Sequence, residues 1–280
     1  MILIWLVKFF HVFVLVNNMI FDTHIHLNDD KYTNLDVLIK EAKELGINAF
    51  LCVGYDLESS KKAIEIASKF DNVFASVGVI PTEHKQYNDD TINELRKLVK
   101  SSSKVKAIGE IGLDYYWEKE EKIKEKQKRM FIEQIALANE LDLPVSIHVR
   151  DSLNDTLNIL KIYKVNKAGI MHCYSGSLDL AKEFIKLGFY IAFGGVLTFK
   201  NSKVSKEVLK NIPLERIVFE TDAPYLSPTP YRGQINLPKY IFNTLKYASE
   251  ILNINLNELE KITFNNSLKI LHVENYEIKS

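Results

Sequence analysis

The runs Pro144-Val145-Ser146-Ile147-His148 and Gly169-Ile170-Met171-His172 decide the fold class of this 280-residue chain. Each run is short and apolar and lacks alternation of apolar and polar residues, which is typical of strands covered on both faces. Such strands run parallel to their neighbours, and parallel strands must be joined by crossover connections. Both runs close on a histidine, so two consecutive predicted strands present an imidazole at their carboxyl ends.

Similar runs, with helical patterns between them, extend from this region to both ends of the chain. Eight strands within this length predict an α/β fold in a single domain, a TIM-type (β/α)8 barrel, with a doubly wound open sheet as the alternative. Gly46 and Gly188 each follow a helical pattern and fit C-terminal stops. The strands are predicted at residues 20–22, 49–53, 73–77, 107–110, 145–149, 169–172, 190–193 and 217–220, and the clearest helices at 35–45, 122–141 and 178–187.

Composition is that of a folded globular protein, with 46% apolar and 26% charged residues. The 36 basic residues balance the 36 acidic ones, whereas a protein that grips long nucleic-acid duplexes usually carries a basic surplus. Any nucleic-acid contact is therefore expected to be local to a pocket. Two cysteines, Cys52 and Cys173, are too few for a disulfide framework, so we expect two buried thiols and a cytoplasmic location.

The chain divides into three predicted parts: an apolar extension over residues 1–18, a barrel over 19–272 and a tail over 273–280. The extension is too short for a membrane span of about 20 residues and lacks the basic start and cleavage site of a signal peptide. Met19 begins a segment that leads directly into the first strand. We therefore interpret 1–18 as a translation-start artefact, or alternatively as a weak membrane-associating tag, and expect no stable membrane insertion.

His24 and His26 lie two residues apart at the end of the first predicted strand. Residues i and i+2 project to the same side of a strand, so both imidazoles are expected to face one point. Asp22 and Asn28 flank them and are predicted to orient the rings. Alone, this pattern is also typical of two polar loop histidines, and it indicates a metal only together with further ligands.

Glu110 ends the fourth predicted strand, where a buried carboxylate is costly unless it is paired or ligated. The nearby Gly109 and Gly112 allow the backbone to approach a site closely. A salt bridge with Arg150 is the structural alternative. Because a carboxylate has two oxygens, Glu110 is the best candidate to bridge two metal ions.

Asp222 follows the eighth predicted strand and is expected to ligate a metal and to accept a proton from an attacking water. The alternative is a helix N-cap, which Ala223-Pro224 disfavours because these residues lead into a loop. Glu220 lies two residues back on the same face and is predicted to support the site from behind.

Four imidazoles and two carboxylates at the ends of five predicted strands can hold two divalent ions, at the end of a barrel where active sites lie. Two such ions can activate a water against a phosphoester or an amide. Cys173 beside His172 is a weaker nucleophile candidate, since a thiol would not need the other metal-type residues, and no Gly-x-Ser-x-Gly motif occurs. The six predicted ligands are His24, His26, Glu110, His148, His172 and Asp222.

With these motifs the chain resembles the TatD family of metal-dependent deoxyribonucleases, part of the amidohydrolase-like barrels, from Met19 to about Leu271. The matching segments are Phe21-Asp22-Thr23-His24-Ile25-His26-Leu27, Gly109-Glu110-Ile111-Gly112-Leu113-Asp114-Tyr115, Ile147-His148-Val149-Arg150, Met171-His172-Cys173-Tyr174-Ser175-Gly176 and Glu220-Thr221-Asp222-Ala223-Pro224-Tyr225-Leu226.

The resemblance implies a nuclease in which a water activated by two divalent ions (Mg, Mn or Zn) attacks a phosphodiester, with Glu110 and Asp222 as catalytic residues. It implies exonuclease action on DNA, for which we expect single-stranded or frayed ends as substrate and no protein partner. The implied ligand sets are His24, His26, Glu110 and Asp222 for one ion and Glu110, His148 and His172 for the other.

Substrate contacts are predicted at Arg150 and Arg232, because a guanidinium suits the geometry of phosphate. The family pattern Gly-Val-His-Pro reads Gly78-Val79-Ile80-Pro81 here, and His84 is the candidate to replace the missing histidine. The family loop Arg-Gly-Lys-x-Asn-Glu-Pro reads Arg232-Gly233-Gln234-Ile235-Asn236-Leu237-Pro238. Both departures fall on the substrate side of the predicted site.

These departures keep two other functions open. One is an ester or amide hydrolase of the same fold, such as an aminoacyl-tRNA deacylase. The other is a barrel that has lost catalysis and serves as a binding protein, which the six filled ligand positions disfavour.

Overall fold

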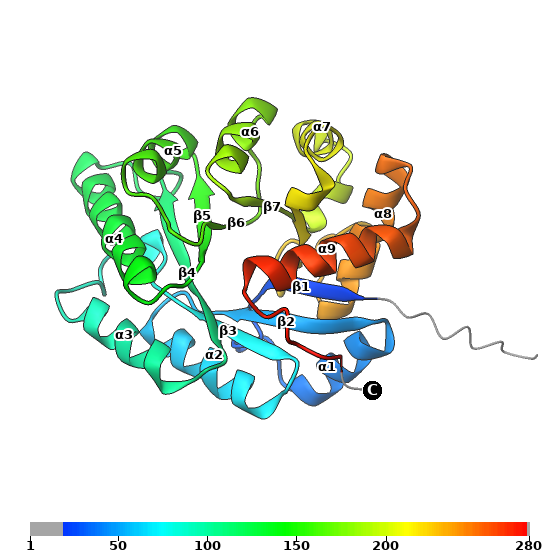
Figure 1. Ribbon diagram of the computed structural model, residues 1–280, viewed down its shortest axis with the longest axis horizontal. Helices are drawn as coiled ribbons and strands as arrows, with labels where there is room; N and C mark the ends of the chain where they lie inside the picture. Colours follow the sequence, from blue (N-terminus) through cyan, green and yellow to red (C-terminus); the bar gives the residue numbers. More distant parts are fainter. Residues whose placement is uncertain (1–18, 279–280) are drawn as a thin grey trace, which may run out of the picture.

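The computed structural model describes residues 19–278, so the predictions made for residues 1–18 lie outside the described part of the chain. Strands and helices alternate along it (Figure 1). The strands are β1 (Ile20–Ile25), β2 (Ile47–Val53), β3 (Val73–Val77), β4 (Val105–Asp114), β5 (Val145–Arg150), β6 (Gly169–Met171), β7 (Tyr190–Phe193) and β8 (Ile217–Phe219).

All pairings between consecutive strands are parallel, in the order β1 to β8, and this confirms the predicted single-domain (β/α)8 barrel over an open sheet. The barrel is nearly closed where β8 meets β1, through a bridge between Ile25 and Ala223. Side chains complete this β8–β1 seam. Thr221 donates from its backbone N–H and its hydroxyl to the two oxygens of Asp22, at 3.0 and 2.6 Å.

The three helices predicted from the sequence are present within one residue at each end, as α1, α4 and α6. Gly46 and Gly188 follow α1 and α6 with φ of 84° and 96°, which confirms their role as C-terminal stops. The helices are α1 (Leu35–Glu44), α2 (Leu57–Lys69), α3 (Thr91–Ser101), α4 (Glu121–Glu140), α5 (Leu153–Ile162), α6 (Leu178–Lys186), α7 (Lys203–Asn211), α8 (Ile241–Leu252) and α9 (Leu256–Ile270), with short 3-10 turns η1 (Pro81–Glu83), η2 (Gly195–Thr198), η3 (Leu214–Arg216) and η4 (Pro238–Tyr240).

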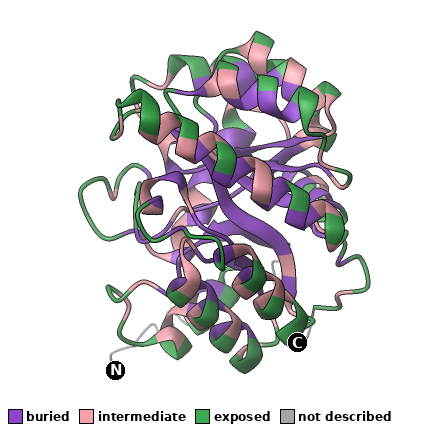
Figure 2. Cartoon of the chain, turned by 90° about the vertical axis from the view of Figure 1, so that its left-hand side faces the viewer, coloured by how far each residue is buried: buried purple, intermediate pink, exposed green. Residues whose placement is uncertain are grey.

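Apolar side chains fill the barrel, so its interior is a packed core. Figure 2 shows the strands buried, with helices around them that expose their outer faces. Phe21 on β1 stacks on Phe74 of β3 and packs against Phe264 of α9, with ring centroids 6.0 and 6.2 Å apart. Helix α9 thus closes the amino end of the barrel and leaves the carboxyl end, where the active sites of such barrels lie, open.

The tail beyond α9 packs on the barrel as far as the structure describes it. Val273 is buried, and the Tyr276 hydroxyl donates to the backbone carbonyl of Asn48. Among the described residues, no helix combines the length and the apolar character that crossing a membrane requires.

Candidate metal centre

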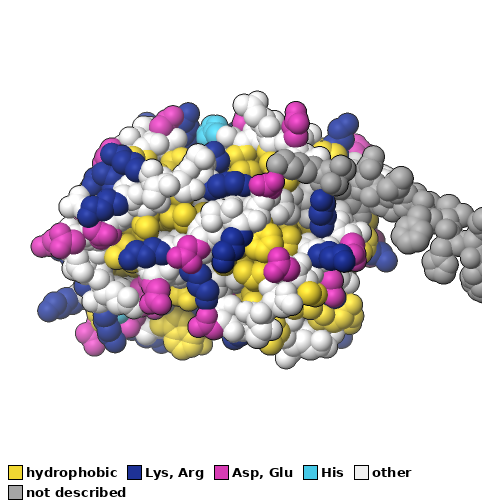
Figure 3. All heavy atoms as spheres, turned by 90° about the horizontal axis from the view of Figure 1, so that it is seen from below, with side chains coloured by type: hydrophobic (Ala, Val, Ile, Leu, Met, Phe, Trp, Pro, Cys, Tyr) yellow, Lys and Arg dark blue, Asp and Glu magenta, His cyan; other side chains and the backbone are white. Residues whose placement is uncertain are grey.

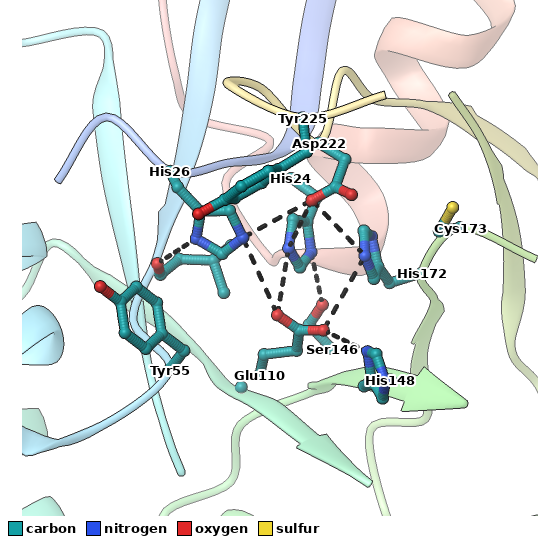
Figure 4. A network of polar contacts seen from close by, with 12 residues as sticks. His24, His26, Tyr55, Glu110, Ser146, His148, His172, Cys173, Asp222 and Tyr225 are labelled. Carbon is teal, nitrogen blue, oxygen red and sulfur yellow. Dashed lines mark hydrogen bonds and ion pairs between the residues drawn. The ribbon is translucent and has the colours of Figure 1, made fainter. Parts of the chain in front are cut away.

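The six predicted ligands meet at the carboxyl end of the barrel (Figure 4). Parallel strands bring their carboxyl ends to one rim, which is why residues far apart in sequence converge there. His148 is half-buried and the other side chains are almost fully enclosed. Their positions are His24 on β1, His26 directly after it, Glu110 on β4, His148 on β5, His172 directly after β6 and Asp222 in the loop after β8.

Glu110 occupies the centre of this cluster. Its Oε1 lies 2.8 Å from Nδ1 of His148, and its Oε2 lies 3.4 Å from Nε2 of His24. The fourth strand does not end at Glu110, as the sequence suggested, but continues to Asp114. The β4–β5 register is irregular between Ile108 and Ile111, and irregularities of this kind re-aim a side chain. The salt bridge to Arg150 considered above is not formed; the histidines take its place.

Asp222 faces the same space from the opposite side. Its Oδ1 lies 3.5 Å from Nε2 of His26, 3.8 Å from Nε2 of His172 and 3.9 Å from Nε2 of His24. The residue has a left-handed φ of 54°, and its N–H donates to the carbonyl of His24 across the seam. Asp222 therefore sits in a fixed turn and caps no helix.

The geometry of these side chains fits divalent ions. The buried Nε2 of His24 has no hydrogen-bond partner in the described chain, although two carboxylates lie 3.4 and 3.9 Å away. These separations are mostly too long for good hydrogen bonds but suit donor atoms that surround a common ion at about 2.0–2.2 Å. Three compact groups result: His24, His26 and Glu110; Glu110, His148 and His172; and His24, His172 and Asp222.

In three of the four histidine rings, the nitrogen Nδ1 points away from the cluster and contacts another group. Nδ1 of His24 lies 3.3 Å from the hydroxyl of Ser146, Nδ1 of His26 lies 3.0 Å from the carbonyl of Val53, and Nδ1 of His172 lies 2.9 Å from Glu220. Such partners set the orientation of an imidazole and leave Nε2 for the cluster. The support predicted from Glu220 is therefore present.

The roles predicted for Asp22 and Asn28 need correction. Asp22 binds Thr221 and the backbone N–H of His24, so it secures the seam and does not touch a ring. Burial raises the pKa of Asp22 to about 8. Asn28 donates to the carbonyl of Val53 and thus acts on His26 only through that shared acceptor.

Asp114 belongs to the matching segment around Glu110 and is a member of the site to which we assigned no role from the sequence. Its Oδ2 lies 3.0 Å from Nε2 of His148, so that ring is held between Asp114 and Glu110. Its position at the end of the strand that carries Glu110 could have indicated a role at the same rim. We predicted that this strand ends at Glu110, and Asp114 was therefore not considered.

The carboxylates and histidines of this cluster shift one another's pKa values. Burial alone would raise the pKa of Glu110, but the charge interaction with His24 and the hydrogen bond with His148 outweigh it and hold the pKa well below its usual range. Burial opposes charge on His148 as well, yet its hydrogen bonds to Asp114 and Glu110 raise its pKa to about 9. The carboxylates are therefore ionised at neutral pH, as metal ligands must be.

A cavity of about 400 Å³ opens beside the cluster, within the size range of small-molecule sites. Its polar side carries His148, His172 and Asp222, and Arg150 stands at its edge. Its apolar wall contains Phe193, Val196, Leu197 and Leu226. Cys52 is buried as expected, but Cys173 is only partly buried and lines this cavity, because the chain turns there with a φ of 45°.

Of the three predicted substrate contacts, the structure brings only Arg150 to the cavity. The guanidinium of Arg232 lies over the ring of Phe199, 4.0 Å from its centroid, and outside the cavity lining. His84 is buried after η1 and lines none of the described cavities. In the altered loop, Asn236 donates to the carbonyls of Thr221 and Tyr225 and so braces the loop that carries Asp222.

The surface agrees with the balanced net charge. On the face in Figure 3, which views the molecule of Figure 1 from below, basic and acidic side chains are interspersed. That face offers no broad basic track for a nucleic-acid backbone.

Comparison with known proteins gives one consistent result. Residues 21–272 match the family described as TatD related DNase. The uncharacterized metal-dependent hydrolase YabD of Bacillus subtilis is 39% identical over 257 residues, covering 91% of this chain and 100% of YabD.

Solved structures agree. The crystal structure of YjjV, a TatD homologue from Escherichia coli, superposes with a TM-score of 0.86 at 26% identity, covering 92% of this chain and 98% of YjjV. A hydrolase TatD family protein from Entamoeba histolytica superposes with a TM-score of 0.80 at 26% identity, covering 90% and 98%.

Proposed function

The chain belongs to the family of TatD-related DNases and is a metal-dependent hydrolase, and on that premise we propose that it is a deoxyribonuclease that degrades DNA from an end. One observation carries the proposal. The carboxylate of Glu110 contacts His24 through one oxygen and His148 through the other, so a single residue joins the two ligand groups.

We assign His24, His26, Glu110 and Asp222 to one divalent ion and Glu110, His148 and His172 to the other. Zn and Mn fit this donor set of imidazoles and carboxylates, Mg would be held more weakly, and we leave the choice among them to measurement. When bound, the ions would polarise a phosphoryl oxygen and make a water more acidic.

The protein's own groups supply the remaining steps. Asp222 lines the cavity and is held ionised by its histidine neighbours against the effect of burial, so it can accept the proton of the attacking water. Glu220 keeps the ring of His172 turned towards the cluster. The Arg150 guanidinium at the cavity edge is placed to hold a phosphate group of the substrate.

The shape of the site favours a free DNA end over a continuous duplex. The cavity is local, and the 36 basic residues of the chain are balanced by 36 acidic ones. We therefore propose single-stranded or frayed DNA as substrate, with no protein partner required and with the cytoplasm as the place of action.

The test is digestion of an end-labelled single-stranded oligonucleotide by the full chain with Mg or Mn, with EDTA, and by the Glu110→Ala variant. We expect shortening by single nucleotides that needs both the metal and Glu110. Glu274→Gln, which changes an exposed carboxylate away from the site, serves as the matched control and should digest normally. Intact DNA in the presence of stoichiometric bound metal would refute the proposal.

A second candidate is hydrolysis of an ester or amide, such as an aminoacyl-tRNA linkage. The apolar wall formed by Val196, Leu197 and Leu226 favours it, because an acyl or side-chain group would fit there. Assays on an aminoacyl ester and on single-stranded DNA, side by side, separate the two functions.

A further inference from the structure

We propose that Trp117 and Tyr116, with Arg150, form a stacking platform that holds a nucleobase of the DNA strand beside the reaction centre. This inference rests on the proposed function and names the part of the substrate that these residues recognise. It goes beyond the metal cluster, because none of the three residues is a candidate ligand.

The two aromatic rings of the platform are exposed to solvent. Trp117 is 64% exposed and Tyr116 is 45% exposed, in the turn that follows β4. Their rings meet edge to face with centroids 4.8 Å apart. Large rings in water lose the favourable burial of apolar surface, so an exposed pair that contacts a cavity-lining residue, here Arg150, is typical of a binding site.

Arg150 joins the rings to the cavity. Its guanidinium carbon lies 3.8 Å from the Tyr116 ring centroid and 5.4 Å from that of Trp117, while the residue also lines the cavity. Within the described chain, the guanidinium has no hydrogen bond or ion pair, so its N–H groups are free for an anion. Stacking leaves the edge of a guanidinium open, and that edge suits a phosphate oxygen.

The platform is fixed relative to the reaction centre. Oδ1 of Asp114 accepts from the N–H groups of Tyr116 and Trp117 at 2.9 and 3.2 Å, an Asx turn. Oδ2 of the same carboxylate lies 3.0 Å from His148. The β4–β5 register also pairs Asp114 with Arg150. One carboxylate thus ties the aromatic turn to the metal cluster.

Rings next to an unpaired cation match the chemistry of single-stranded nucleic acid. Every base has a face that can stack on an aromatic ring, whatever its sequence, and the adjoining phosphate can take the guanidinium. The occupant is therefore a base with its phosphate, and the platform is expected to position DNA without selecting a sequence.

Fluorescence tests the stacking directly, because the chain has two tryptophans, Trp5 and Trp117. A full-chain Trp5→Phe, Glu110→Gln variant reports on Trp117 alone and cannot digest its ligand. We expect a thymidine oligonucleotide to quench the emission, and an abasic oligonucleotide of the same length and charge to leave it unchanged. Equal quenching by both would overturn the platform, since phosphate alone would then account for binding.

Kinetics on the otherwise unmodified full chain provides the second readout. Trp117→Ala should raise KM for single-stranded DNA about tenfold, equivalent to about 1.4 kcal/mol, with kcat changed less than twofold. Trp117→Phe should restore most of the affinity. Tyr163→Ala is the matched control, because Tyr163 is 44% exposed at the end of α5, away from the rim that carries the cluster.

The outcomes separate this inference from the proposed function. If wild-type protein digests DNA and Trp117→Ala leaves KM unchanged, the platform proposal is refuted and the nuclease proposal is retained. If the protein digests no DNA, the nuclease proposal fails and quenching decides: base-dependent quenching supports the platform, and its absence overturns it.

Discussion

Glu260 on α9 is expected to make this protein less stable as the pH rises through the neutral range. The side chain is buried, no side chain of the described residues pairs with its carboxylate, and only the backbone of Met19 offsets part of the cost of burial. Burial raises its pKa from 4.5 to about 7. The folded protein therefore binds this proton more tightly than the unfolded chain does, and the free energy of unfolding falls between about pH 4.5 and pH 7.

The size of the effect follows from the shift. A shift from 4.5 to about 7 is 2.5 units, and at 1.36 kcal/mol per unit the loss amounts to about 3.4 kcal/mol as an upper bound. Glu260→Gln keeps the shape and removes the ionisation. The variant should thus match wild type near pH 5 and exceed it by up to about 3 kcal/mol at pH 8.

Urea unfolding followed by circular dichroism at pH 5, 6, 7 and 8 measures both curves. Glu274→Gln changes an exposed carboxylate a few residues after α9, and its stability should depend on pH in the same way as that of wild type. If Glu260→Gln also loses stability with the wild-type slope, the buried carboxyl is not the titrating group and the reasoning fails.

Three further predictions concern the site and the core. Glu220→Gln should weaken metal affinity by about 10- to 100-fold, because it loses the charge opposite His172; chelator competition measures this, and unchanged affinity would contradict the orienting role. Cys173→Ser should keep kcat within about twofold, and a collapse of activity with metal still bound would instead revive the thiol nucleophile. Phe264→Ala should lower the free energy of unfolding by about 3–5 kcal/mol, since its ring closes the amino end of the barrel; a loss below about 1 kcal/mol in urea would show that this end is not packed as described.

The fold could be predicted because buried parallel strands appear in the sequence as short, continuous apolar runs. Runs such as residues 73–77 and 190–193 coincide with β3 and β7 to the residue. The error at β4 has a physical cause. Its second half carries Glu110, Gly112 and Asp114, a composition that disguises a strand whose register shifts to turn a carboxylate inward.

The candidate ligands could be predicted because all but Glu110, which lies in the middle of β4, are at or near the end of a strand, and the barrel brings these ends together. Their supporting contacts could not. Ser146 and the carbonyl of Val53 reach the rings of His24 and His26 only after strands far apart in sequence have paired. Loop residues were least predictable, since the positions of Arg232 and His84 depend on the path of the loops that carry them.

The seam between β8 and β1 has a consequence for synthesis on the ribosome. Asp22 and Thr221, which join there, are 199 residues apart, and each lies close to a candidate ligand, His24 or Asp222. A nascent chain that has not yet released β8 can bring together Glu110, His148 and His172 but lacks Asp222 and the closure of the barrel. The proposed ligand set is therefore complete only once the chain has been made beyond Asp222 and β8 can pair with β1.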